Sequence, residues 1–153
     1  SILQEELDMS ETAKSENVAG WLRDAYAMEQ QAETMLKSQS ARLENYPKLK
    51  ARIDQHIEET RGQQELLKGC LARLGESPST VKDLGAKLMA MGQGVSGMFV
   101  SDEVVKGAMA GYVFEHLEIV SYTSLIAAAK AIGDTETQRV CEQILPQEEA
   151  MAK

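Results

Sequence analysis

The chain has 153 residues, of which 43% are hydrophobic and 26% charged, and its formal net charge is −8 at pH 7. This length suits one domain with a core large enough to fold. The acidic balance argues against nucleic-acid binding, which relies on Lys and Arg to neutralise phosphates. No apolar stretch is long enough to span a bilayer, and no signal-like segment opens the sequence. We therefore expect neither a membrane nor a nucleic acid as partner.

The composition also predicts the fold class and the compartment. Ala, Leu, Glu, Lys, Gln and Met are plentiful, which favours helix over sheet and predicts an all-α protein. The two cysteines, Cys70 and Cys141, lie within helical patterns. They are expected to pack as small hydrophobic side chains in a reducing compartment rather than to form a disulfide. A cytoplasmic location is therefore predicted.

The N-terminal segment differs in pattern from the rest of the chain. Residues 1–14 are polar and acidic with weak periodicity, which predicts an extended or frayed arm. From about Ser15 or Glu16 towards Asn45, apolar residues recur at spacings that keep to one face of a helix. We therefore predict an N-terminal arm over residues 1–14 and a single domain over residues 15–153.

Proline and glycine delimit the second helix. Pro47 suits the first turn of a helix, and Gly75 supplies a C-terminal stop. Beyond Gly75, apolar residues at helical spacing are interrupted by several glycines, which weaken a helix. We expect residues 76–100 to form a long crossover segment that carries an additional short helix and a Gly-rich stretch.

The rest of the chain predicts two more helices. The third is expected to begin near Ser101 and to run to about Ile132, with Gly133 as its stop. The fourth opens at Asp134 or Thr135. Four long helices with a long connection between the second and the third are the layout of a ferritin-like four-helix bundle, whereas simple up-down bundles use short loops throughout.

Glutamates occupy positions on these helices where a bundle normally places leucine. Each long helix carries at least one of them on its apolar face: Glu29, Glu59, Glu115 with Glu118, and Glu148. A buried carboxylate is unfavourable unless a positive charge neutralises it. Because neither Lys nor Arg recurs on these faces, bound metal is the simplest explanation.

A histidine adds to this set. His56 lies three residues before Glu59, a spacing that places both on one helical face. Iron and manganese accept carboxylate oxygens and imidazole nitrogens. We therefore predict two divalent metal ions, with iron preferred to manganese, held by His56 and the five glutamates. In this arrangement Glu59 and Glu148 bridge the ions, and the other ligands occupy the outer positions.

Each candidate also has a simpler explanation. A single glutamate on the apolar face of a helix is more often a partly exposed residue at the boundary of the core. His56 could equally well be a core histidine held by hydrogen bonds. Rotation of a helix by one residue would bring in Glu58 or Glu149 instead. Tyr26 and Tyr122, one turn from seam glutamates, are candidates either for hydrogen-bond donors to the site or for packing residues.

The second histidine and the catalytic motifs give only weak signals. His116 comes directly after Glu115 but points about 100° away, which predicts a structural or surface role. No nucleophile motif and no phosphate-binding loop emerges. Catalytic residues therefore stay unassigned.

Three motifs carry a family resemblance, and they occur in order as D-A-Y-A-M-E-Q-Q, H-I-E-E-T-R-G-Q and E-H-L-E-I-V-S-Y. Together with the terminal L-P-Q-E-E-A-M-A-K, they resemble the YciE/YciF-type stress proteins over about residues 17–153. The resemblance implies a ferritin-like, rubrerythrin-related bundle, a role in bacterial stress responses and a homodimer. Di-iron bundles usually carry Glu-x-x-His on two helices, whereas here Gly62 and Met151 stand where those histidines are expected.

Two functions compete on these grounds. The first is a stress-response protein with a carboxylate-rich di-metal site that acts on iron, oxygen or peroxide, as a di-iron or di-manganese oxidoreductase with an unidentified redox partner. The second, motivated by the missing histidines, is a non-catalytic interaction protein that has kept the bundle and lost metal chemistry. The acidic balance disfavours a third function, a storage or DNA-protecting cage.

Overall fold

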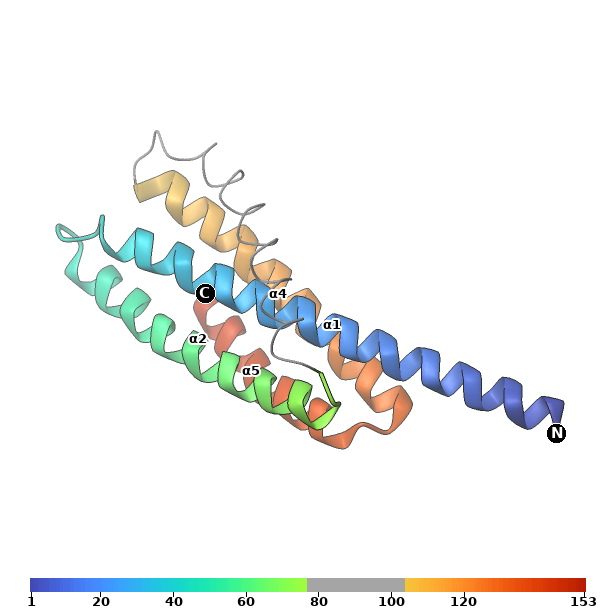
Figure 1. Cartoon of the computed structure of the whole chain (residues 1–153). Coiled ribbons are helices and arrows are strands. Elements are labelled where there is room, and N and C mark those ends of the chain that lie inside the picture. Colours follow the sequence, from blue (N-terminus) through green and yellow to red (C-terminus); the bar gives the residue numbers. More distant parts are fainter. Residues whose placement is uncertain (77–103) are drawn as a thin grey trace.

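A computed structural model describes residues 1–76 and 104–153. Over these residues the chain forms four α-helices: α1 (Ile2–Ser40), α2 (Pro47–Arg73), α4 (Val104–Ile132) and α5 (Thr135–Ala152). The helices lie side by side as a bundle (Figure 1), in which α1 packs against α2 and α4, and α5 packs against α4 and α2. The predicted all-α bundle is therefore confirmed. The expected crossover segment with its short helix lies outside the described residues.

Local sequence signals set the helix ends. Pro47 occupies the first turn of α2. Gly75 and Gly133 have φ angles of 78° and 76°, the left-handed conformation that glycine adopts just past the end of a helix. Asp134 caps α5, since its side chain accepts a hydrogen bond from the backbone N–H of Thr137. These boundaries agree with the predictions made from the same residues.

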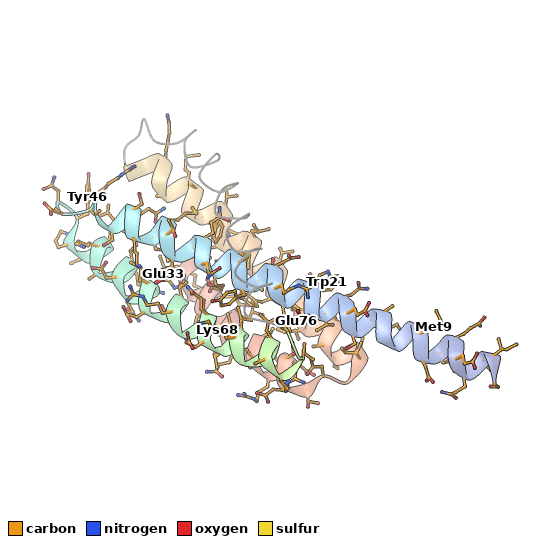
Figure 2. All side chains as sticks on the ribbon, in the orientation of Figure 1. Met9, Trp21, Glu33, Tyr46, Lys68 and Glu76 are labelled. Atoms are coloured by element: carbon orange, nitrogen blue, oxygen red, sulfur yellow. The ribbon has the colours of Figure 1, made fainter. Side chains whose placement is uncertain are left out.

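The start of the chain is helical, so the predicted extended or frayed conformation of residues 1–14 is wrong. α1 begins at Ile2, where the Ser1 side chain caps it by accepting from the backbone N–H of Gln4. Residues 1–10 are exposed, and Met9 lies on the part of α1 that projects beyond the other helices (Figure 2). The weak periodicity of apolar residues therefore reflects a segment that faces solvent and not a segment without helix. The helix propensity of its residues is sufficient to extend α1 towards the N-terminus.

The core consists of two groups of buried apolar side chains, one on each side of the buried glutamates. On α1, Met28 belongs to the larger group and Leu36 to the smaller, and Glu29 lies between them in sequence. On α5, Glu148 comes after Ile144 of the larger group and precedes Met151, which packs against the smaller. Glu29 and Glu148 therefore lie in the interior of the bundle, between two apolar layers.

Two further predictions bear on the environment of the protein. Cys70 and Cys141 are both free and buried, as expected for residues that pack as small hydrophobes. Among the helices of residues 1–76 and 104–153, none combines the length and the apolar character needed to cross a membrane.

Candidate metal centre

Four side chains from three helices converge in the interior of the bundle. His56 on α2, Glu115 and Glu118 on α4, and Glu148 on α5 each place one possible ligand atom within 4.8 Å of the others. Glu115 is 6% exposed and the other three are 0% exposed. We call these residues the four-residue cluster. All four were predicted metal ligands.

The histidine is the centre of this cluster. Its Nε2 lies 3.1 Å from Glu115 Oε1 and 3.3 Å from Glu148 Oε2. Burial lowers the pKa of His56, but hydrogen bonds to the two carboxylates outweigh burial and raise this pKa to about 10. In the absence of metal, a protonated imidazole therefore supplies positive charge to the cluster.

The carboxylates of the cluster differ from one another in acidity. Burial raises the pKa of Glu115 to about 7. Burial, together with the neighbouring Glu29, raises the pKa of Glu118 well above its usual range. Burial also acts to raise the pKa of Glu148, but its contacts with His56 and with the two other cluster carboxylates lower it to about 2. The cluster therefore holds a shared set of protons rather than independent groups.

Glu29 on α1 adds a fifth carboxylate beside the cluster. The hydroxyl of Tyr122 donates a 2.6 Å hydrogen bond to Glu29 Oε1, and both side chains are 0% exposed. Burial and the nearby Glu148 raise the pKa of Glu29 well above its usual range. Of the two alternatives for Tyr122, the hydrogen-bond donor is the one observed. The Tyr26 hydroxyl instead accepts from Gln30 Nε2 at 3.3 Å.

The structure does not bring Glu59 into the cluster. Its half-buried carboxylate lies on the other side of the imidazole, with Oε1 3.2 Å from His56 Nδ1 and 2.9 Å from Arg52 Nη1. A carboxylate in this position fixes the ring orientation so that Nε2 faces the interior. The neighbour Glu58 is exposed and pairs with Arg61.

The remaining candidates lie at the surface. Glu149 is exposed. His116 is exposed as well, and its ring meets that of Tyr112 edge-on with centroids 4.3 Å apart. Of the structural or surface role predicted for His116, the surface position is the one observed. Helix α5 has the register that turns Glu148 inward and leaves Glu149 exposed.

Two more polar residues on α2 are buried, and neither was among the predicted ligands. Thr60 and Gln63 are 0% and 1% exposed, and Thr60 Oγ1 and Gln63 Oε1 have no hydrogen-bond partner among the described residues. The signal was present in the spacing, because positions four and seven residues after His56 return to the same helical face.

The donor atoms fit a divalent cation. Both oxygens of Glu118, together with Glu29 Oε2, Glu115 Oε2 and Glu148 Oε1, are buried without a hydrogen-bond partner among the described residues. Unpaired buried carboxylate oxygens are costly, and a metal ion is the ligand that satisfies several of them at once. Carboxylate oxygens with one imidazole nitrogen are a donor set that iron, manganese and zinc accept.

A cavity of about 210 Å³ opens beside Glu115. Its lining comes from all four helices and is largely apolar, with Leu36, Leu43, Ile53, Gly111 and Met151 among the residues. Glu115 is the one carboxylate of the cluster among its lining residues.

Comparison with known proteins places these features in a family. Residues 13–153 match the family described as "Domain of unknown function (DUF892)". The chain belongs to the DUF892 family. The crystal structure of a protein from Xanthomonas campestris pv. campestris is similar, with a TM-score of 0.74 and 42% sequence identity over 91% of this chain and 85% of that one. DUF892 is a ferritin-like family, which agrees with the fold predicted from the sequence.

Proposed function

We propose that this DUF892 protein is a ferritin-like metal protein that binds two divalent ions between its helices, with iron preferred to manganese. The observation that carries the proposal is the set of buried carboxylate oxygens near His56 that have no hydrogen-bond partner within residues 1–76 and 104–153. Such a set is unfavourable without cations and matches the core sites of di-metal bundles. Bound iron or manganese would supply redox chemistry towards oxygen or peroxide.

The residues of the chain have separate tasks in this proposal. His56 and Glu115 would provide ligands for one ion, Glu29 and Glu118 would provide ligands for the other, and Glu148 would contribute a further carboxylate. Tyr122 keeps Glu29 in place through its hydrogen bond. Glu59 orients the imidazole of His56 from the outer side, a role that takes the place of the bridging position expected from the sequence.

The biological setting is proposed on the resemblance to YciE/YciF-type proteins. It supports a role in stress responses and assembly as a homodimer. A cytoplasmic location is consistent with two free, buried cysteines. The apolar cavity beside Glu115 suits oxygen or peroxide better than a bulky charged substrate.

A second function is favoured by one specific observation. His56 already places an imidazole between Glu115 and Glu148, so the bundle has an internal positive charge without metal. A non-catalytic interaction protein that folds in the metal-free state would look the same in this respect.

Metal binding to the purified protein distinguishes the two functions. We expect the metal-free protein to take up two ions of iron or manganese per chain. At an ion concentration a hundred times the dissociation constant, binding stabilises the folded state by about 2.7 kcal/mol, which raises the melting temperature by roughly 5–10 °C for a domain of this size. Failure to retain iron or manganese after supplementation, with no change in melting temperature, would favour the interaction protein.

A further inference from the structure

The inward face of α2 continues beyond His56 as a row of polar atoms. Gln63 lies two turns further along the helix and is 1% exposed. Its Nε2 donates a 2.8 Å hydrogen bond to Gln147 Oε1, which leaves the Gln63 amide oxygen buried without a partner among the described residues. An amide oxygen is a neutral metal ligand of the hard type.

This part of α2 lies beside Glu29. Gln64, the next residue, places its Nε2 3.4 Å from the backbone oxygen of Glu29. Glu29 Oε2 and both Glu118 oxygens are likewise buried without a partner among the described residues, and the two carboxylates are near enough to repel each other electrostatically. The Glu29 side of the centre therefore gathers oxygen atoms, whereas the imidazole of His56 lies with Glu115.

We propose that the two ion positions are chemically unequal and that Gln63 is a ligand of the second. The first position has the His56 imidazole with Glu115. The second has oxygen donors only, from Glu29, Glu118 and the Gln63 amide, and Glu148 is shared. This inference rests on the proposed metal centre and specifies the metals that each position takes.

The donor sets predict different preferences. Imidazole nitrogen favours zinc, cobalt and iron over manganese, in line with the general order of affinity for divalent metals, whereas an all-oxygen site suits Mn²⁺ and Mg²⁺. The two positions therefore prefer different metals. Zinc, cobalt or iron is preferred at the position with His56, and manganese or magnesium at the position with Gln63.

A two-step titration tests this assignment. Metal-free protein receives one equivalent of Zn²⁺ and is then titrated with Mn²⁺, with free Mn²⁺ measured by electron paramagnetic resonance. We expect one Zn²⁺ and one Mn²⁺ to bind per chain. Gln63→Leu, which keeps a similar volume without the amide oxygen, should weaken Mn²⁺ binding by about tenfold or more and change Zn²⁺ affinity by less than about twofold.

Two further variants complete the experiment. Gln63→Glu restores an oxygen ligand and should return Mn²⁺ affinity to at least the wild-type value, which shows that any loss in Gln63→Leu comes from the ligand rather than from misfolding. Gln55→Leu, at an exposed position of the same helix, should change the affinity for neither Zn²⁺ nor Mn²⁺. If two ions bind with equal affinity, and Gln63→Leu changes neither affinity, this inference is overturned but the proposed metal centre is not. Absence of any bound ion would overturn both.

Discussion

His56 Nε2 on α2 lies 3.1 Å from Glu115 Oε1 on α4, although 59 positions separate the two residues in the sequence. This contact links two helices across the interior and places a titratable cation among carboxylates. The proton on the imidazole has the charge sign of a metal ion, so proton and metal compete for the same place. Metal binding should therefore release protons, and the metal-free protein should depend on pH in a characteristic way.

Four groups should make the metal-free protein less stable as pH rises above about 4.5. The pKa values of Glu29, Glu115 and Glu118 are raised from 4.5 by burial, so above pH 4.5 the unfolded chain binds fewer protons than the folded protein and stability falls. The pKa of His56 rises from 6.5 to about 10. Its contribution is complete below pH 6.5 and is lost as pH rises towards 10.

Glu148 acts in the opposite sense at low pH. Its pKa falls from 4.5 to about 2, so its contribution is present above pH 4.5 and is lost as pH falls towards 2. Thermal unfolding in the presence of a chelator should therefore show a maximum melting temperature between about pH 4.5 and 6.5. A melting temperature that climbs from pH 6 to pH 9 without metal would contradict this assignment of protons.

Glu118→Gln should stabilise the metal-free protein while weakening the metal site. Both Glu118 oxygens are buried without a hydrogen-bond partner among the described residues, and glutamine keeps the shape of the side chain but cannot ionise. We expect a gain of about 1–2 kcal/mol at neutral pH without metal, since replacing an uncompensated buried ionisable group is often stabilising. The gain should disappear when iron or manganese is added. Glu142→Gln, at an exposed position of α5, is the control and should leave both measurements unchanged.

Tyr122→Phe should destabilise the protein because it removes the donor to Glu29. The phenyl ring fills the same buried space, so the loss reports the hydrogen bond, and we expect about 1–3 kcal/mol in denaturant unfolding. Tyr112→Phe on the same helix is the matched control, since Tyr112 is 58% exposed and should change stability by less than about 0.5 kcal/mol. Equal effects of the two changes would show that Tyr122 has no special part in the site.

Glu59→Gln should lower metal affinity although Glu59 lies outside the cluster. Its carboxylate holds His56 Nδ1 and is itself held by Arg52. Loss of such an outer partner typically costs about 10- to 100-fold in metal affinity. Glu58→Gln is the control, since Glu58 is exposed and pairs with Arg61. Isothermal titration with Mn²⁺ compares the two variants, and a Glu59→Gln protein with wild-type affinity would exclude the orienting role.

Much of this architecture could be predicted from local signals. The effects of Pro47, Gly75 and Gly133 on the backbone are local. These residues therefore predicted helix ends without knowledge of the tertiary fold. The inward position of Glu115, Glu118 and Glu148 could be predicted from periodicity, because each lies among apolar residues at helical spacing.

The parts that escaped prediction depend on long-range packing. On α2, residues 56, 59, 60 and 63 all lie near one face, and a small rotation decides which of them turn inward. Contacts of α2 with its neighbours bring His56, Thr60 and Gln63 into the interior and leave Glu59 at the edge with Arg52. The helical start of α1 escaped for another reason, since residues 1–10 are exposed and carry no core-facing pattern that periodicity could reveal.

The proposed chemistry depends on metal ions binding among these buried carboxylates. Anomalous X-ray scattering, from crystals of the protein grown with iron or manganese and measured at the absorption edge of that metal, tests this binding most directly. We predict two peaks enclosed by Glu29, His56, Glu115, Glu118 and Glu148. Crystals without a peak at this position, or with peaks at surface carboxylates only, would contradict the proposed metal centre.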